Sequence, residues 1–463
     1  MKYSDEKVVN AIYTDNILRN PYIEALPEEL GKETFMKRIA SYPPLPYDLS
    51  KKKPEERRHE LTVINNIFFP MDYMYNLYDM LYRAILDNYS SKNMIDAIRQ
   101  INLLRQDFNG TDARNEYSTQ SYSGALLGVP GIGKSSSIRR SLSLMPQVII
   151  HTNYNGFSMY QKQIIYLCVE CPCDCSVKTL AASIIMAIDQ AIGSDYFEDM
   201  VKNKRLTSAS ALAMKVKIAC LNHRIGIIVI DEIQNAVITA EKTRQLKPLI
   251  KFLVELTNET CVSICFTGTL EAEEIFTSQE HLMRRTRGYR LLPLKPDKSY
   301  YDFLSAIWNY QWVLGRNEIK EKIANAIYDY SGGIPSYIIK IFIEAQVQAI
   351  MTGTEQISIE TIKRVVSILN INVQKTYKGG VSISDFQISK IDLVDKDEKN
   401  DDTKAQQKNT TYFATKPKGR PTNRRDLEDL IELYKESSSS NDLKKKMTQI
   451  NMSEFFRKGQ YSC

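Results

Sequence analysis

The sequence predicts an α/β fold in which a parallel sheet with flanking helices is followed by a small helical domain and a flexible C-terminal tail. A glycine-rich phosphate-binding motif lies between a segment with strand character and a segment with helix character. Two further apolar runs each end in polar side chains, as buried parallel strands do at a ligand site. Further along the chain, the apolar residues recur with helical spacing.

The phosphate-binding motif occupies residues 128–135, which read Gly-Val-Pro-Gly-Ile-Gly-Lys-Ser, a complete G-x-x-x-x-G-K-S pattern. Residues 123–127, a short run that ends in Ala-Leu-Leu, predict a strand before it, and residues 135–144, which contain no Gly or Pro, predict a helix after it. In such a loop the backbone N–H groups wrap a phosphate chain, the lysine neutralises the β- and γ-phosphates, and the serine binds Mg²⁺. The strand–loop–helix context disfavours a chance match. The expected ATP-binding residues are Gly128, Val129, Pro130, Gly131, Ile132, Gly133, Lys134, Ser135 and Ser136.

The second half of the predicted site is an acidic pair. Residues 225–230 form an apolar run typical of a strand buried on both faces, and Asp231 and Glu232 follow it directly. At the carboxyl edge of a parallel sheet, Asp231 would hold Mg²⁺ together with Ser135, and Glu232 would polarise the water that attacks ATP. The alternative is a strand that ends in a solvated acidic turn, which the upstream phosphate loop disfavours.

A third strand is predicted at residues 260–266, and two threonines follow it. Thr267 and Thr269 are both candidates to hydrogen-bond the γ-phosphate or the attacking water, and the sequence does not choose between them. Arg284 and Arg285 come later, at a distance from which arginines of a neighbouring subunit could neutralise transition-state charge. A basic, solvated turn is the alternative for these arginines.

Four helices are expected after a last strand at residues 289–292. They are predicted at residues 298–310, 318–330, 337–351 and 358–370. A helical lid behind an α/β core with these motifs resembles the arrangement of AAA+ ATPases. The turn Ser-Gly-Gly-Ile-Pro ends at Pro335, which we expect beside the nucleotide. Many AAA+ proteins carry arginine after this proline. Here the position is Ser336, and Lys340, one turn later, is the candidate substitute.

Composition bounds the class of protein. The chain has 463 residues, of which 43% are hydrophobic and 25% charged, an ordinary globular balance with room for two to four compact units. No run approaches the roughly 20 apolar residues of a membrane span, and the first residues carry no apolar signal segment. We therefore expect a soluble, cytoplasmic protein without membrane contact. The net charge of +6 is too small to establish nucleic-acid binding by itself.

Four of the eight cysteines cluster within residues 168–175 and allow two interpretations. The spacing of Cys168, Cys171, Cys173 and Cys175 could hold zinc or an iron–sulfur cluster. Against a metal site, residues 164–169 read as a strand, where alternate side chains point to opposite faces, and no second ligand pair appears elsewhere. We favour free thiols, because disulfides are also rare in a reducing cytoplasm.

Other segments resemble a known family. Residues 13–16 (Tyr-Thr-Asp-Asn) and 20–27 (Asn-Pro-Tyr-Ile-Glu-Ala-Leu-Pro) resemble the opening of TnsC, the AAA+ regulator of Tns-type (TnsABC) transposons. Three later segments are also similar to elements of that family: residues 163–167, residues 171–178, and the Asp-Glu-Ile-Gln-Asn of residues 231–235. The likeness covers roughly residues 10–370, and it departs from the family in the cysteine-rich stretch.

The resemblance implies a function that the nucleotide motifs alone do not give. TnsC-type proteins assemble with ATP as rings or helical filaments around double-stranded DNA. They link a target selector (TnsD/TniQ-like) to transposase subunits (TnsA/TnsB-like), and hydrolysis controls disassembly. A bacterial, nucleoid-associated location follows from that role. The rivals are another AAA+ protein, such as an initiator or helicase loader, and a STAND-type signalling NTPase that does not bind DNA.

Contacts to DNA phosphates would suit binding at many sequences. The candidate basic residues lie in a polar loop and after the acidic strand, and an ordinary surface charge is the alternative for each. They are Lys202, Lys204, Arg205, Lys242 and Arg244.

The predicted domain plan has four parts. Residues 1–75 form an N-terminal arm, either a partner-docking surface or a segment packed on its own core. Residues 76–295 form the nucleotide-binding domain and residues 296–372 the lid. Residues 373–463 form a largely flexible tail with short helices that would recruit the transposase. Within the tail, Lys-Pro-Lys-Gly-Arg-Pro at 416–421 is either a minor-groove hook or a basic linker.

Overall fold

The structure, a computed structural model, describes residues 6–15, 20–90, 123–202, 208–236, 246–278, 286–369 and 371. All of them belong to the first of the chain's two compact units, Met1–Lys399. The C-terminal tail predicted at residues 373–463, with its motif at 416–421, lies outside the described residues. None of the described helices is long and apolar enough to cross a membrane.

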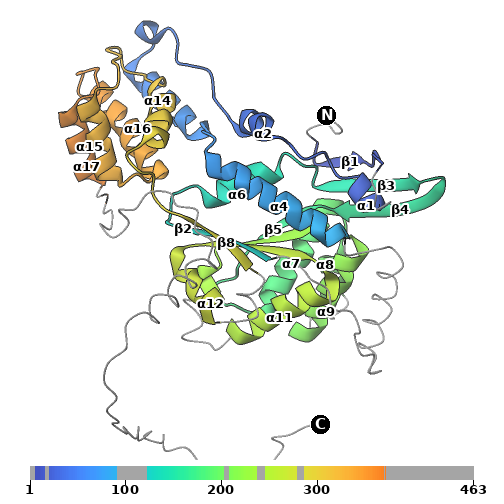
Figure 1. The fold of residues 1–463 in the computed structure, drawn as a ribbon. Coiled ribbons are helices and arrows are strands. Elements are labelled where there is room, and N and C mark those ends of the chain that lie inside the picture. Colours follow the sequence, from blue (N-terminus) through green and yellow to red (C-terminus); the bar gives the residue numbers. More distant parts are fainter. Residues whose placement is uncertain are drawn as a thin grey trace, which may run out of the picture. The chain divides into compact units, whose positions relative to one another are not determined.

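A five-stranded parallel sheet forms the centre of the α/β part, as the sequence predicts (Figure 1). In spatial order its strands are β5 (Tyr166–Glu170), β6 (Ile227–Asp231), β7 (Ser263–Gly268), β2 (Ser123–Gly128) and β8 (Thr286–Leu291). Every neighbouring pair is parallel. Strands β6, β7 and β2 are buried along their whole length, which explains their mainly apolar sequences. Their carboxyl ends therefore meet at one edge of the sheet.

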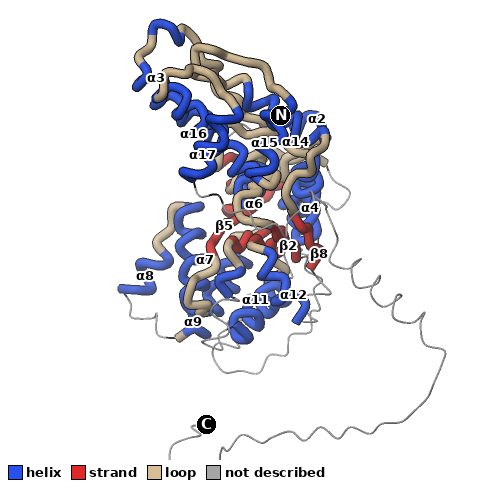
Figure 2. The backbone as a smooth tube through the Cα atoms, turned by 90° about the vertical axis from the view of Figure 1, so that its left-hand side faces the viewer, coloured by secondary structure: helices blue, strands red, loops and turns tan. Residues whose placement is uncertain are grey.

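Helices cover both faces of this sheet (Figure 2). Alternate strand residues belong to the apolar clusters on the two faces. One face packs against α7 (Val177–Ile192), α9 (Ala209–Asn222) and α11 (Leu246–Thr260). The other packs against α4 (Asp72–Ser90) and α6 (Lys134–Leu142). The shorter elements on the first side are α8 (Tyr196–Lys202), η3 (Leu270–Ala272) and α12 (Glu273–Ser278). The phosphate motif thus lies between β2 and α6, as its context predicts.

A second, three-stranded sheet combines β1 (Val8–Asn10), β3 (Val148–Tyr154) and β4 (Phe157–Ile164). The antiparallel pair β3–β4 turns at Asn155 and Gly156, both with positive φ, which suits a tight hairpin. The apolar run at residues 164–169, read as one strand, is divided: Ile164 ends β4 and Tyr166 begins β5. The chain passes from one sheet to the other there, and apolar periodicity cannot detect that change because Ile164, Ile165 and Leu167 are all buried across the junction.

The N-terminal arm packs against two different parts of the molecule. Its helices α1 (Pro21–Glu24) and α2 (Lys32–Ile39) join the apolar cluster formed by α4, α6 and the sheet. Its later elements η1 (Leu49–Lys51), α3 (Pro54–Glu60) and η2 (Leu61–Asn66) lie against the lid helices, and Leu49, Leu61 and Ile64 are buried there. Tyr42, Leu45 and Tyr47, between these two regions, are exposed.

The lid contains the four predicted helices. They are α14 (Lys298–Trp308), α15 (Glu321–Ser331), α16 (Pro335–Met351) and α17 (Ile359–Leu369). Helix α15 ends at Gly332, whose φ of +59° is a left-handed C-cap, and Pro335 begins α16 with a backbone angle already suited to a helix. The Gly-Gly-Ile-Pro segment therefore makes the abrupt turn that directs the start of α16 toward the phosphate loop.

Candidate nucleotide-binding site

The phosphate loop has the backbone shape that its glycines allow. Gly131 and Gly133 have φ values of +80° and +99°, a region that side-chain-bearing residues rarely enter. Helix α6 starts immediately afterwards, at Lys134. The loop therefore leads into a helix N-terminus, where free N–H groups and the helix dipole favour an anion.

The Lys134 ammonium lies over the loop that precedes it. Its Nζ donates to the carbonyl oxygens of Gly128, at 2.9 Å, and Val129, at 3.1 Å. Burial lowers the pKa of Lys134, and the nearby carboxylates of Glu232 and Asp231 partly oppose that shift. These contacts hold the cation within the loop, where it is placed to neutralise a phosphate chain.

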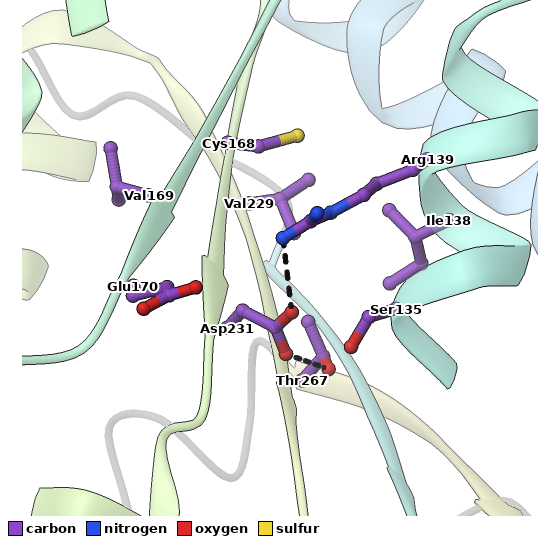
Figure 3. A pocket seen from close by; sticks show the side chains of 9 residues that line it. All are labelled: Ser135, Ile138, Arg139, Cys168, Val169, Glu170, Val229, Asp231 and Thr267. Atoms are coloured by element: carbon purple, nitrogen blue, oxygen red, sulfur yellow. Dashed lines mark hydrogen bonds and ion pairs between the residues drawn. The ribbon is translucent and has the colours of Figure 1, made fainter. Parts of the chain in front are cut away.

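Asp231 lies at the centre of a pocket of about 100 Å³ (Figure 3). Its Oδ1 accepts hydrogen bonds from Thr267 Oγ1, at 2.7 Å, and from the Glu232 backbone N–H, at 3.0 Å. On the other side, Arg139 Nη2 reaches from α6 to within 3.9 Å of Asp231 Oδ2. The pocket is lined by Ser135, Ile138, Arg139, Cys168, Val169, Glu170, Val229, Asp231 and Thr267.

The residues in this pocket fit a magnesium ion. Ser135 and Asp231 come from α6 and β6, and they line the same small space. A hydroxyl and a carboxylate provide the oxygen ligands that Mg²⁺ prefers, and Mg²⁺ usually keeps several waters besides one or two protein ligands. The pairing predicted from two distant motifs is thus brought together by the fold.

The two candidate threonines have different surroundings. Thr267 is fully buried, lines the pocket and donates to Asp231. Thr269 Oγ1 instead donates to Glu271 Oε2, at 3.2 Å, and the Thr269 backbone N–H donates to Gln234 Oε1, at 3.0 Å. Thr267 is therefore the threonine placed beside the expected metal ligand.

Glu232 follows Asp231 on the strand end, and its negative charge acts on the Lys134 ammonium of the phosphate loop. Its backbone has a φ of +56°, its side chain is exposed, and its carboxylate accepts a hydrogen bond from Gln234 Nε2. The lining residues of the pocket include Asp231 but not Glu232. The two neighbouring carboxylates are thus separated into one that faces the pocket and one held by Gln234.

The lid touches the phosphate loop through the start of α16. The Ser336 backbone N–H donates to Gly131 O, at 3.2 Å, and a Cβ at Gly131 would lie only 2.1 Å from Ser336 Oγ. Ile334 packs into the apolar cluster that contains Val129. Pro335 lies in the chain between these two contacts, and its place beside the nucleotide stays a prediction. Lys340 is exposed, one turn further along the helix.

Several predicted residues lie outside the described part of the chain. They are Arg284, Arg285, Lys204, Arg205, Lys242 and Arg244. Lys202 is described: it ends α8, its side chain is 66% exposed, and its Nζ pairs with Glu198 Oε1 at 2.6 Å.

The cysteine cluster is divided by burial. Cys171 and Cys175 are buried, whereas Cys168 and Cys173 are exposed. Cys175 Sγ lies 3.2 Å from the Asn235 carbonyl oxygen, to which it donates. Within the described ranges, no group of three or more His, Cys, Asp or Glu side chains is arranged to hold a metal ion.

Sequence reasoning missed three residues around the pocket. Arg139 stands four residues after Ser135, so helical spacing places both on one face of α6. Glu170 pairs in register with Asp231, since β5 and β6 are neighbours and both end in acidic residues. These two could have been found from spacing. Gln234 is named only within the resemblance at residues 231–235, and its contact with Thr269 carries no local signal, because Thr269 follows a different strand.

Three comparisons with known proteins were made, and one of them, the family model, matches this part of the chain. Residues 117–276 match the family model of the AAA domain. A search of curated protein sequences found no match. Among solved structures, the chain is similar to Drosophila ORC bound to DNA, with 13% identity, 74% of each chain covered and a TM-score of 0.39. For the Aeropyrum pernix ORC2 protein (ADPNP–ADP complexes) the values are 13% identity, 61% of this chain and 69% of that one, and a TM-score of 0.36. For the Thermotoga maritima RuvB Holliday junction branch migration motor the identity is 12%, the alignment covers 62% of this chain and 74% of that one, and the TM-score is 0.32.

These structural similarities are distant, so the assignment depends on the family model. That model spans the phosphate loop, the acidic strand end and Thr267, which the fold gathers around one pocket. This part of the protein is an AAA-type P-loop ATPase domain.

Proposed function

We propose that the protein is an ATP-dependent DNA-binding regulator of transposition, similar to TnsC. ATP binding assembles copies of the chain on target DNA, where they link a target selector to the transposase, and hydrolysis controls disassembly. The observation that carries the ATPase part is the convergence of Ser135, Asp231 and Thr267 in one pocket beside the phosphate loop. The transposition part is supported by the resemblance over residues 10–370.

In the proposed reaction, residues of this chain divide the work between binding and hydrolysis. Lys134 and the loop N–H groups bind the β- and γ-phosphates. Ser135 and Asp231 hold Mg²⁺, which would offset negative charge on the phosphates. Thr267 keeps the Asp231 carboxylate in place through its 2.7 Å hydrogen bond. Glu232 orients the attacking water and accepts its proton.

Assembly would follow from a site shared between copies. We propose that Arg284 or Arg285 of a neighbouring copy completes the nucleotide site, so that bound ATP joins two subunits. Within one copy, the contact of Ser336 with Gly131 would let the ligand state of the phosphate loop pass to the lid. A filament aligned in this way places many weak basic contacts along one duplex.

The experiment compares DNA binding with ADP, with a non-hydrolysable ATP analogue and without nucleotide, on several unrelated duplexes and over a range of salt. We expect binding with the analogue only, at similar affinity for all sequences, and a steep fall with salt. Lys134→Ala should abolish both nucleotide binding and assembly. Charge reversal at Lys202 and Arg205, or at Lys242 and Arg244, should weaken binding uniformly and flatten the salt slope.

A matched control is Lys37→Glu on α2. Lys37 is 74% exposed and pairs with Glu33 in the same i, i+4 arrangement that Lys202 has with Glu198. Its reversal should leave DNA affinity unchanged. An absence of DNA binding in every nucleotide state would overturn the proposal and favour a signalling NTPase. Sequence-specific binding without nucleotide would assign DNA recognition to the tail around Arg420 instead.

A further inference from the structure

Gln234 joins the ends of two strands of the nucleotide site. Its side chain is buried, and both ends of its amide are used. Nε2 donates to the Glu232 carboxylate, and Oε1 accepts from the Thr269 backbone N–H at 3.0 Å. Glu232 follows β6 and Thr269 follows β7. One side chain therefore connects the acidic strand end to the neighbouring strand end.

The neighbouring strand leaves Gln234 little freedom. A Cβ at Gly268 would lie 2.6 Å from Gln234 Oε1 and 2.8 Å from Ile233 Cγ2, so the backbone of β7 approaches this segment closely. The Ile233 backbone N–H also donates to Thr267 O, at 3.0 Å. The position of the amide is thus fixed by contacts that do not involve Glu232. By contrast, the Glu232 side chain is exposed and needs a partner to fix its rotamer.

We propose that Gln234 is a positioning residue that holds the Glu232 carboxylate for water activation. The inference rests on the proposed function, in which Glu232 is the general base. Thr267 ties Asp231 to β7, and Gln234 ties Glu232 to the same strand end. The carboxylate that holds the metal and the carboxylate that activates water are consequently both fixed to the end of β7, and so is the distance between them.

Two substitutions of similar size separate positioning from simple packing. Gln234→Met keeps the volume and removes both hydrogen bonds. Gln234→Glu keeps the acceptor for the Thr269 N–H but places a second carboxylate against Glu232. We expect kcat for ATP hydrolysis to fall about tenfold for the Met variant and further for the Glu variant, with the Kd for ATP within about twofold of wild type. A packing role alone would make the Glu variant the milder one, because it keeps the contact with Thr269.

A second measurement does not depend on hydrolysis. The double variant Glu232→Gln with Gln234→Glu exchanges the two groups and restores an amide–carboxylate pair. Its thermal midpoint should recover at least half of the loss seen for Gln234→Glu alone, because neighbours in one hydrogen-bond pair are not additive. Additive losses would show that the two side chains do not interact, and would overturn the inference.

The control is Gln346→Met in the lid. Gln346 is also buried and joins two segments, since it accepts from the Trp312 N–H and donates to Tyr310 O. Its loss should lower the thermal midpoint and leave kcat within about twofold. If Gln234→Met keeps the wild-type kcat while Glu232→Gln is inactive, the positioning role of Gln234 is overturned and the general base is not. Wild-type kcat in Glu232→Gln would instead overturn the proposed general base, and the inference with it.

Discussion

The nucleotide site and the contact between the N-terminal arm and the lid both contain an arginine–carboxylate pair, and the two pairs are built differently. Arg139 lies 3.9 Å from Asp231, and its side chain is 62% exposed. Arg57 is 3% exposed, makes two bonds of 2.7 Å with the Glu355 carboxylate and donates to Trp312 O at 2.9 Å. An exposed, single contact can exchange partners at little cost, whereas a buried, doubly bonded one cannot.

The difference indicates what each region does. At the nucleotide site, Arg139 contacts Asp231 in the pocket, and Lys134 donates to carbonyl oxygens of the phosphate loop, where metal and phosphates are expected. In the arm–lid contact, further bonds surround the ion pair: the Trp312 indole N–H donates to Glu60, and Lys52 also pairs with Glu60. The first region is suited to ligand exchange and the second to holding the arm on the lid. The predictions below test that contrast.

The largest effect is expected on catalysis. Glu232→Gln keeps size and hydrogen bonding but removes the base, so turnover should fall by at least about 100-fold while ATP still binds. Phosphate release and the equilibrium binding of a fluorescent ATP analogue measure the two separately. Glu271→Gln, which changes an exposed carboxylate that accepts from Thr269, is the control. If Glu232→Gln retains turnover, Glu170, in register with Asp231, becomes the next carboxylate to change.

Arg57→Met should separate the arm from the lid. It leaves the Glu355 carboxylate, 21% exposed, without its cation, and we expect the lid to lose about 3 kcal/mol of stability. Both tryptophans of the chain, Trp308 and Trp312, lie in the lid, so tryptophan fluorescence during denaturant unfolding reports this region. A change below about 1 kcal/mol would show that this pair resembles an ordinary surface contact.

The same pair sets a pH dependence. The hydrogen bonds from Arg57 hold the pKa of Glu355 below its ordinary value of 4.5. A carboxylate with a lowered pKa contributes stability that is present above its unfolded pKa and is lost as pH falls through its folded pKa. The stability difference between wild type and Arg57→Met should therefore be constant near neutral pH and shrink below about pH 4.5. A difference that persists at lower pH would assign the effect to packing of the arginine stem.

Gly131→Ala should weaken ATP binding by about tenfold. The φ of +80° is strained for alanine, and the new Cβ would collide with Ser336 Oγ. Adding Ser336→Gly removes the collision and leaves the backbone strain, so the double variant should recover part of the affinity. Isothermal titration with ATP measures the affinity of the single and of the double variant. Full recovery would show that the lid contact alone sets the effect, and no recovery would assign it to the loop backbone.

The smallest effect is expected for Arg139→Ala. Its exposed pair with Asp231 should contribute less than about 0.5 kcal/mol to stability. Because the guanidinium lies at the carboxylate expected to bind Mg²⁺, its removal should lower the Mg²⁺ concentration for half-maximal turnover by a few fold. Arg83→Ala, 67% exposed and paired with Asp79 on α4, should change neither quantity. A large loss of stability from Arg139→Ala would contradict the contrast between the two regions.

The sequence by itself determined the elements with local causes. The glycines of the phosphate loop are required by positive φ at Gly131 and Gly133, and the strands β2, β6 and β7 are continuous buried runs with little competing signal. Helices α14 to α17 follow from periodicity, Gly332 and Pro335. Because parallel strands align their carboxyl ends, Asp231 and Thr267 could also be predicted to meet.

Only the tertiary structure decided the contacts between distant segments. Arg57 and Glu355 are 298 residues apart, and nothing in the local pattern around either one names the other. The choice of Thr267 over Thr269 for the pocket depends on which side chain faces Asp231. Gln234 acquires its contact with Thr269 only when β6 and β7 lie side by side. Local propensity acts over a few residues, so it specifies strands and turns, whereas the partners of a side chain depend on how those elements pack.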